Sequence, residues 1–381
     1  MKKFFFFSLG FLFLSLIFLV AYNVAFKNNA NNPLAETTEK SKKEETKDTP
    51  PEERAPSTVI LNVLHEKISS ADVLENGEVI YYSLDDRSFK KASSEGKDKT
   101  ILLSNLPSDP LRVVWSPKKD RVLALLQQTS GPARWHFIDL TTKTLTPLKN
   151  DVGRLTWDNL GDKIFYQYTD QKSDKRTLNT SNPDGTNWKE ITPLRHDSYI
   201  APVPRSISVS FWNKPNALEK TFFETASLSG ENRRLLLAEK FGADYLWSPN
   251  GERILVSLTE EKGGHRTSLG VMNSNGGEFQ NLQIPTLISK TIWSKDNRTV
   301  YFSLPGSLPE NAMLPNDYFE KSLHTKDTFW KMDVLTGKKT RIVDLKEVAN
   351  AFDSNNLLLS RNEESLFFID RVTKQLFRID L

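Results

Sequence analysis

Few residue types in this sequence are spaced in ways that support chemistry. The five histidines are scattered, and none lies at metal-ligand spacing from another: His65, His136, His196, His265 and His324. No Asp-x-Asp-x-Asp-Gly calcium loop is present, and no glycine-rich phosphate loop follows a strand. A serine peptidase would need a Gly-x-Ser-x-Gly elbow with a downstream Asp and His, and the sequence has no such elbow. The sequence therefore predicts no catalytic residue, no metal and no cofactor.

Tryptophan marks a recurring segment. Trp115-Ser-Pro-Lys-Lys-Asp-Arg-Val-Leu is similar to Trp247-Ser-Pro-Asn-Gly-Glu-Arg-Ile-Leu, and related segments begin at Trp157 and Trp293. Each has an aromatic residue at a strand end, then a polar turn, then an apolar strand. A ring of stacking sites for sugars or bases is one interpretation. Packing between neighbouring repeats is the interpretation that we favour, because a large aromatic side chain contributes most there.

The segments recur at a period of about 45 residues, which is the length of a β-propeller blade. Trp157 follows Trp115 by 42 residues, Trp293 follows Trp247 by 46, and Trp247 follows Trp157 by 90, or two units of 45. A degenerate unit, with Tyr199–Pro204 and Ile207–Trp212, fills the wider gap. Each unit continues with a hairpin whose turn is of the Asn-Gly or Asp-Gly type. Four strands per unit indicate an all-β propeller.

The number of units predicts seven blades. Asn76-Gly77 with Val79–Tyr82 opens the first unit, and the last unit, from Leu357, stops one strand short at the C-terminus. We expect Thr58–Leu64 to supply the missing strand, because joining the two terminal strands in one blade closes the ring and removes an exposed edge. Six blades is the alternative if the degenerate or the incomplete unit forms no blade of its own.

The pattern Trp-Ser-Pro-x-Gly-x-x-Ile at Trp247–Ile254, with hairpins such as Asn182–Thr192, resembles the TolB-type propeller repeat over roughly residues 57–381. The resemblance implies the fold. TolB is a soluble periplasmic propeller that binds envelope partners, and this chain departs from it in its predicted anchor, its tether and its lack of a recognisable second domain. Ser181–Trp188 also looks like the Asp-box of sialidase propellers. Pro183 stands where Asp is expected, so we interpret the segment as a hairpin turn.

The N-terminal residues predict a membrane anchor. Met1-Lys2-Lys3 precedes an apolar run from Phe4 to Phe26, which as a helix of roughly 34 Å would cross a hydrocarbon core of about 30 Å. The two lysines should stay cytoplasmic, so the rest is exported. A cleaved signal peptide is the alternative. We expect a single-pass transmembrane signal anchor at 1–26, a disordered linker rich in charge and proline at 27–56, and the propeller at 57–381.

Composition excludes several classes of partner and site. The 381 residues include no cysteine, which excludes disulfides, thiolate zinc sites and cysteine nucleophiles. The formal net charge of +3 is too small to indicate a nucleic-acid partner. We expect a monomer.

The insertion (Leu304–Thr328) adds about 20 residues to the sixth unit, and long loops on a rigid scaffold often carry function. It is suited either to a contact patch or to folding over the propeller's own face. The equivalent connections of other units, Thr169–Arg176 and Glu260–Arg266, should emerge on the same face with basic side chains. The candidate binding residues are Met313, Leu314, Tyr318, Phe319, Lys172, Lys175, Arg176, Lys262 and Arg266.

These observations predict a non-enzymatic, extracytoplasmic binding propeller. It would be tethered to the cell membrane through Phe4–Phe26 and hold an envelope protein or polymer on its loop face. One alternative is a glycan hydrolase or lyase with a site in the central channel, and another is a structural or sensory ectodomain. Carboxylates with perturbed pKa values at a channel mouth would favour the enzyme, and an exposed apolar patch at Met313–Phe319 would favour the binding module.

Overall fold

The computed structural model describes residues 59–381, except 307, 345–347 and 349. The predicted anchor and linker lie outside these residues. No helix in the described part of the chain is long and apolar enough to cross a membrane. Its two short helical segments are the 3₁₀ helix η2 (Ile288–Lys290) and α2 (Asn316–Phe319). Nearly all other regular structure is antiparallel β-sheet, so the predicted all-β class is confirmed.

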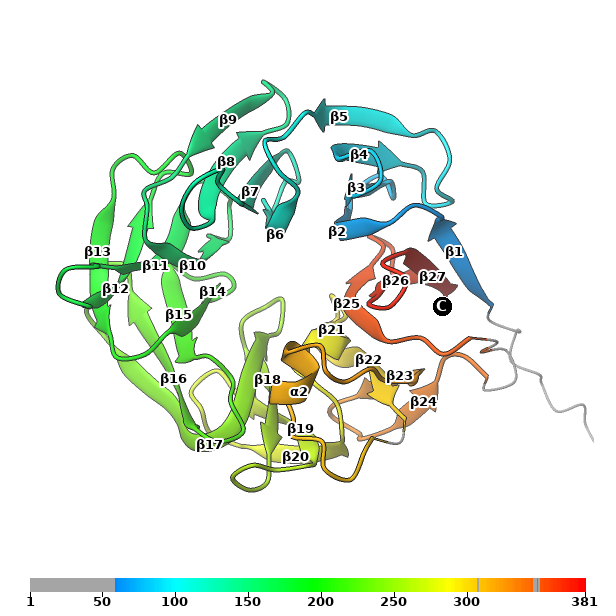
Figure 1. Ribbon diagram of the computed structural model, residues 1–381. Helices are drawn as coiled ribbons and strands as arrows, with labels where there is room; N and C mark the ends of the chain where they lie inside the picture. The colour runs from blue at the N-terminus through cyan, green and yellow to red at the C-terminus, as the bar shows by residue number, and fades with distance from the viewer. Residues whose placement is uncertain (1–58, 307, 345–347, 349) are drawn as a thin grey trace, which may run out of the picture. The chain divides into compact units, whose positions relative to one another are not determined.

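The first three sheets each contain four strands that pair in chain order. They follow one another around a ring, and the first strand of each lies nearest the centre (Figure 1). The second strand of each sheet is the most apolar, as a strand covered on both faces requires. The strands are β2 (Ile68–Val73), β3 (Val79–Ser83), β4 (Ser88–Ala92) and β5 (Thr100–Ser104); β6 (Pro110–Trp115), β7 (Arg121–Leu126), β8 (Arg134–Asp139) and β9 (Thr144–Pro147); β10 (Val152–Trp157), β11 (Ile164–Thr169), β12 (Arg176–Ser181) and β13 (Lys189–Leu194).

The next sheet has seven strands and contains both the degenerate unit and the Trp247 unit. β17 belongs to both units, because residues 234–241 pair with β16 and residues 241–247 pair with β18. Gly242, with φ +60°, lies where the strand changes partner, and this conformation favours glycine. The strands are β14 (Ser198–Pro202), β15 (Ser208–Asn213), β16 (Lys220–Ser227), β17 (Arg234–Trp247), β18 (Arg253–Thr259), β19 (Thr267–Asn273) and β20 (Gln280–Ile284).

The last two sheets complete the ring. Strand β1 pairs with β27, with Ile60 opposite Ile379 and Asn62 opposite Phe377, so the N-terminal strand fills the place left by the short C-terminal unit. This closure confirms the expected pairing for Ile60–Leu64, while Thr58 lies outside the described residues. The strands are β21 (Thr291–Trp293), β22 (Thr299–Pro305), β23 (Asp327–Asp333) and β24 (Lys339–Arg341); β25 (Ser354–Leu359), β26 (Ser365–Asp370), β27 (Leu376–Asp380) and β1 (Ile60–Leu64).

The hydrophobic core lies between neighbouring sheets, and the repeat tryptophans are part of it. The indole N–H of Trp157 donates to the Val114 carbonyl oxygen at 3.0 Å, and that of Trp293 donates to the Leu246 oxygen at 3.3 Å. Each bond joins the first strand of one unit to the first strand of the unit before it. The packing interpretation of these tryptophans is therefore confirmed. Ser181–Trp188 forms the β12–β13 hairpin, as the sequence predicted.

Closure of the ring can be tested with two leucines on the same strand. Leu64 is 0% exposed and packs between the first and last sheets, whereas Leu61 is 40% exposed. We expect Leu64→Ala to lower the free energy of unfolding by about 2–5 kcal/mol, because a large core side chain is lost. Leu61→Ala, the matched control, should cost about 0.5 kcal/mol or less. Denaturant titration of the purified chain measures both, and equal small losses would show that β1 does not pack in the last sheet.

Candidate functional site

Each repeat has a position three residues before its tryptophan, on the innermost strand. Arg112 on β6, Arg154 on β10 and Asp244 on β17 occupy this position in three units. Because the units repeat around the ring, equivalent positions on neighbouring innermost strands lie at the same height. Ionisable side chains are thereby concentrated at one level.

The degenerate unit supplies a fourth member. The Val203 N–H donates to the Ser208 carbonyl oxygen at 3.0 Å, just as the Ser116 N–H donates to the Arg121 oxygen at 2.9 Å. This shared turn hydrogen bond aligns the two units and makes Tyr199 on β14 the equivalent residue. We call Arg112, Arg154, Tyr199 and Asp244 the inner-strand cluster.

The members of the inner-strand cluster interact across units. The Arg154 guanidinium carbon lies 3.8 Å from the centre of the Tyr199 ring, and Arg154 Nη2 donates a 2.9 Å hydrogen bond to the Tyr199 hydroxyl oxygen. Arg112 as a whole residue is exposed, although protein surrounds much of its guanidinium group, and the other three residues are partly buried. Burial lowers the pKa of Arg112, and the positive charge of Arg154 lowers it further. The two guanidinium groups are thus close enough to repel each other.

Asp244 carries a carboxyl group whose ionisation the protein opposes. Burial raises its pKa to about 6. The Tyr245 N–H and the Trp212 indole N–H both donate to Asp244 Oδ1, at 3.0 and 2.9 Å, and they reduce this rise without cancelling it. A carboxyl group with this pKa gains and loses its proton near neutral pH, as a general acid or base must.

A cavity of about 410 Å³ lies beside the inner-strand cluster. It is bounded by α2 and by the connections that precede β14 and β16. Asp197 lines the cavity and also lies near enough to Arg112 to favour its charged form, so the cavity and the cluster adjoin. A second cavity of about 150 Å³ shares part of this wall. The main cavity has lining groups of both charges and one aromatic ring, among them Arg176, Arg195, Asp197, Lys214, Asn316 and Phe319.

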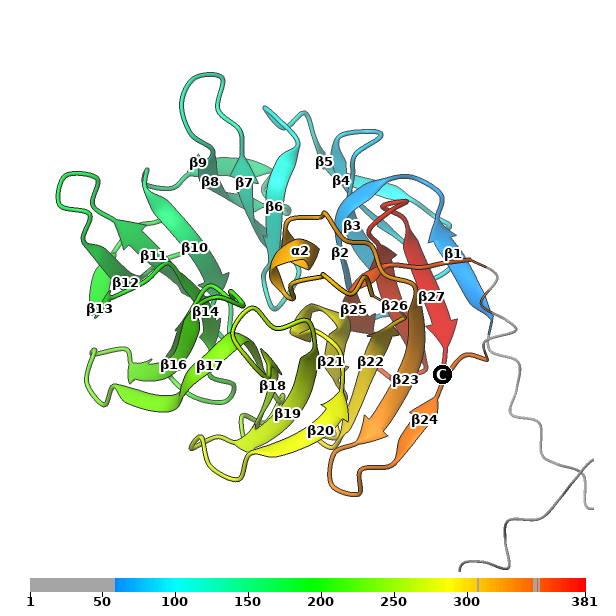
Figure 2. The ribbon, with the colours of Figure 1, turned by 60° about the horizontal axis from the view of Figure 1, so that its bottom comes forward.

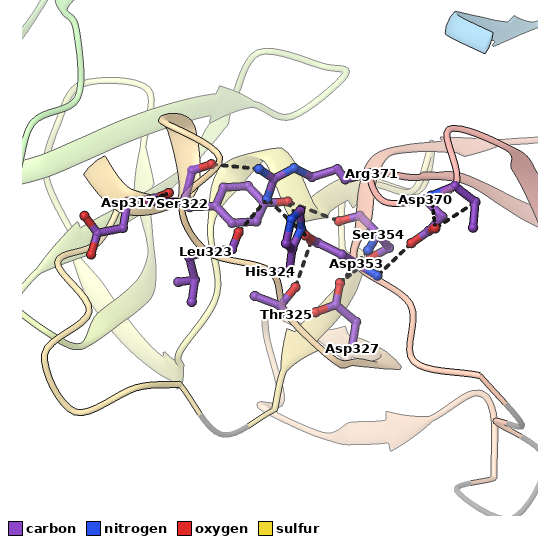
Figure 3. A network of polar contacts seen from close by, with 12 residues as sticks. Asp317, Ser322, Leu323, His324, Thr325, Asp327, Asp353, Ser354, Asp370 and Arg371 are labelled. Atoms are coloured by element: carbon purple, nitrogen blue, oxygen red, sulfur yellow. Dashed lines mark hydrogen bonds and ion pairs between the residues drawn. The ribbon is translucent and has the colours of Figure 1, made fainter. Parts of the chain in front are cut away.

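Lys290 occupies the same repeat position before Trp293, but it is fully buried. Its ammonium group lies 2.6 Å from Asp327 Oδ2, 3.1 Å from Asp353 Oδ1, 3.0 Å from Thr325 Oγ1 and 2.6 Å from the Ser354 carbonyl oxygen. Burial opposes the charge on Lys290, but its carboxylate neighbours prevail and its pKa is raised. Figure 3 shows Asp327, at the end of the insertion, close to Asp353 and Ser354 at the start of the last unit.

Arg371, between β26 and β27, fixes the helical part of the insertion (Figure 3). Its Nη1 donates to Asp353 Oδ2 at 3.1 Å, and its Nη2 donates to the Tyr318 carbonyl oxygen at 2.9 Å. The guanidinium carbon lies 3.8 Å from the centre of the Tyr318 ring, and Lys290 Nζ lies 4.8 Å from it. Tyr318 is therefore enclosed between two cations, an arrangement that its ring stabilises.

The insertion also reaches the fourth and fifth units. Asn316 Oδ1 accepts the Ala217 N–H at 2.8 Å, and the Leu314 N–H donates to the Gly264 carbonyl oxygen at 3.3 Å. Gly242 makes room for it, because a Cβ atom there would lie 2.8 Å from Pro315 Cδ. The insertion thus lies across one face of the ring (Figure 2) and joins the connections of several units on that face.

These contacts correct part of the predicted binding patch. Leu314 and Tyr318 are each 3% exposed, because they pack with Leu287, Ala312 and Leu323 beneath the insertion. They are therefore not available to a partner. For these two residues the alternative prediction applies, in which the insertion folds over the propeller's own face. Met313 is partly buried.

Two of the predicted residues meet in the cavity. Arg176 and Phe319 both line it, although they are far apart in the sequence. Lys172 and Lys175 are exposed on the β11–β12 connection, and Lys262 and Arg266 are exposed on the β18–β19 connection.

The inner-strand cluster was not predicted from the sequence. The signal was present, since a charged residue stands three positions before four of the repeat tryptophans. His196 lines the cavity and stacks on Phe222 with ring centres 6.3 Å apart. Within residues 59–381, apart from 307, 345–347 and 349, no group of three or more His, Cys, Asp or Glu side chains could hold a metal ion.

No protein-family model matches the chain, and no curated protein matches it. Among solved structures, an oligogalacturonate lyase in complex with manganese is 12% identical over 85% of this chain and 90% of that chain, with a TM-score of 0.59. The β-propeller domain of Cps50 (Swd1) from Myceliophteria thermophila is 9% identical over 85% of this chain and 100% of that chain, with a TM-score of 0.55. The chain folds as a β-propeller.

A putative TolB from Agrobacterium tumefaciens is 11% identical over 59% of this chain and 87% of that chain. Its TM-score of 0.45 is too low to support a TolB-type repeat in particular. At these identities, the first two structures establish the fold of the propeller and not its activity.

The environment of Asp244 predicts a pH-dependent stability difference. The pKa of its carboxyl group is about 6 in the folded propeller and about 3.9 when unfolded, so ionisation destabilises the fold as pH rises between these values. Asp244→Asn removes this loss and should raise the melting temperature most above pH 6. The gain should shrink as pH falls towards about 4.

Thermal unfolding at several pH values measures this difference. Asp162→Asn, at an exposed turn, is the control and should show no such trend. A gain for Asp244→Asn that stays constant with pH would contradict the raised pKa.

Proposed function

We propose that this chain is a non-enzymatic binding propeller that works outside the cytoplasm, tethered to the cell membrane through Phe4–Phe26. It acts as a monomer and holds an envelope protein or polymer on its loop face. The observation that carries the proposal is the cavity of about 410 Å³ between α2 and the connections before β14 and β16. Its walls are mostly polar and include the partly buried ring of Phe319. Such walls suit a site that orients a ligand through hydrogen bonds and charge.

The cavity walls are held in place before any partner arrives. Asn316 Nδ2 donates to Asn216 Oδ1 at 2.9 Å, and both residues line the cavity. At the other end of the insertion, the Lys290 ion pairs secure the same segment. A preformed site loses little conformational entropy on binding, which favours affinity for its size.

Exposed basic groups surround the cavity on the same face. Lys172 and Lys175 precede Arg176, and Lys262 and Arg266 lie on the β18–β19 connection, which contacts the insertion through Gly264. We propose that these residues, with Met313 and Phe319, extend the contact to an acidic surface of the partner. Charge at the rim would mainly accelerate association and select the partner.

The proposal includes seven blades of the TolB type. Gly242 divides β17 into a part that completes the β14–β16 group and a part that opens the β18–β20 group. These two groups of four, with the five four-stranded sheets, make seven.

Charge reversal on the loop face tests the binding role. Arg176→Glu with Arg195→Glu should abolish cross-links between the full chain and its envelope partner, because two cavity cations become anions. Lys118→Glu with Lys143→Glu, at exposed turns of the opposite face, is the matched control and should keep every cross-link. Cross-linking in intact cells followed by mass spectrometry makes the comparison. The same set of cross-links in both variants would refute docking on the loop face.

A glycan-active hydrolase or lyase is the second candidate, and Asp244 favours it. A carboxyl group with pKa about 6 stands near Tyr199 and Arg154, in a propeller whose fold resembles that of oligogalacturonate lyase. In a lyase reaction, a base removes a ring proton, the glycosidic C–O bond breaks, a carbon–carbon double bond forms, and the departing sugar oxygen takes up a proton from water. Asp244 would accept the proton, and Arg154 would stabilise the negative charge of the intermediate.

Turnover of oligogalacturonate tests the second candidate. If Asp244 is the base, the rate should rise as pH passes about 6, because the carboxylate form increases. Asp244→Asn should lower the rate about a hundredfold or more, whereas Arg205→Gln, at an exposed turn, should leave it unchanged. Ultraviolet absorbance of the new double bond measures the rate. No product from the unaltered chain would leave binding as the function.

A further inference from the structure

A cation stands at the same repeat position in the Trp115, Trp157 and Trp293 units. The three cations differ in whether a carboxylate pairs with them. Lys290 forms ion pairs with Asp327 and Asp353. Arg112 and Arg154 form no ion pair with any residue that the structure describes. Two cations of the inner ring therefore lack the counter-charge that the third has.

The two arginines belong to strands that are fixed against each other. The Trp157 indole N–H donates to the Val114 carbonyl oxygen at 3.0 Å, which joins β10 to β6 within a few residues of both arginines. Arg154 is also stacked on the Tyr199 ring and bonded to its hydroxyl oxygen. These contacts hold one guanidinium in place and leave Arg112 exposed beside it.

The Tyr199 hydroxyl can still donate. Its oxygen accepts a hydrogen bond from Arg154 and is also within hydrogen-bonding reach of Arg112, and no described residue accepts its proton. A ligand oxygen placed between Arg112 and Arg154 would be within reach of this donor. The three side chains then offer two charged donors and one neutral donor to the same ligand group.

We propose that Arg112 and Arg154 bind the carboxylate group of a small ligand, with the Tyr199 hydroxyl as a third donor. Guanidinium and carboxylate groups match in shape and form paired, charge-assisted hydrogen bonds. The site adjoins the cavity through Asp197. The proposal goes beyond both proposed functions, since it requires neither an envelope partner nor turnover.

Local charge favours a carboxylate over a phosphate. Asp197 lies near Arg112, and Asp244 lies near Arg154 and Tyr199, so part of the positive charge is already offset at longer range. A singly charged ligand balances what remains. A doubly charged phosphate would bring excess negative charge beside two carboxyl groups.

Calorimetric titration of the full chain in detergent tests the site, with four probes: glucuronate, succinate, glucose and inorganic phosphate. We expect glucuronate to bind, and succinate either to bind as well or not to bind. Binding by both indicates that the carboxylate suffices, and binding by glucuronate alone indicates that hydroxyl groups add recognition. Glucose should not bind, and phosphate should bind more weakly than the carboxylates.

Arg112→Gln should weaken glucuronate binding by about ten- to a hundredfold, as expected for a lost hydrogen bond to a charged group. Arg112→Lys, which keeps the charge without the paired donors, should lose less. Arg205→Gln is the matched control and should bind like the unaltered chain. Because Arg112 forms no ion pair with a described residue and Arg154 keeps its own contacts with Tyr199, Arg112→Gln should keep its melting temperature.

The proposal is overturned if neither carboxylate binds, if phosphate binds more tightly than both, or if Arg112→Gln leaves affinity unchanged. Retained envelope cross-links alongside such a result would leave the binding role intact. Conversely, carboxylate binding without any partner on the loop face would refute only that role.

Discussion

The buried ammonium group of Lys290 determines how the loop face is arranged. It joins the end of the insertion, through Thr325 and Asp327, to the start of the last unit, through Asp353 and Ser354. Removing one charged partner would leave the others buried without compensation, so these groups stabilise one another's position. Tyr318 is consequently enclosed, and the insertion serves as a fixed cover over part of the ring. The remaining part of the same face keeps the cavity and the inner-strand cluster.

One repeat position therefore has two roles in the propeller. In the Trp293 unit, its cation is paired with carboxylates supplied by the insertion and the last unit, and it contributes to structure. In the Trp115 and Trp157 units, no carboxylate in the described part of the chain pairs with the cation, and we propose that these two cations bind a ligand. Divergence at equivalent positions of a repeat is how a propeller acquires a site without changing its backbone. The degenerate unit adds to this asymmetry, because Tyr199 stands where its neighbours have charged residues.

The sequence predicted features that depend on local pattern. The period of the tryptophans and the turn residues predicted the strands, the packing between units and the β1–β27 closure, since each follows from the alternation of strands and turns. It could not predict which side of the insertion faces inward. That outcome depends on Asp353 and Arg371, dozens of residues away, and on Ala217, almost a hundred residues before Asn316. The inner-strand cluster combines both cases. Its offset from the tryptophans is visible in the sequence, but the pKa of Asp244 and the stacking of Arg154 on Tyr199 arise only when the ring forms.

An experimental structure of the full chain with bound glucuronate would test this account most directly. The account predicts a carboxylate between the Arg112 and Arg154 guanidinium groups and within hydrogen-bonding distance of the Tyr199 hydroxyl. It also predicts an insertion still fixed through Lys290 and Asp327. A ligand bound elsewhere, or arginines turned away to pair with carboxylates of the propeller itself, would contradict it.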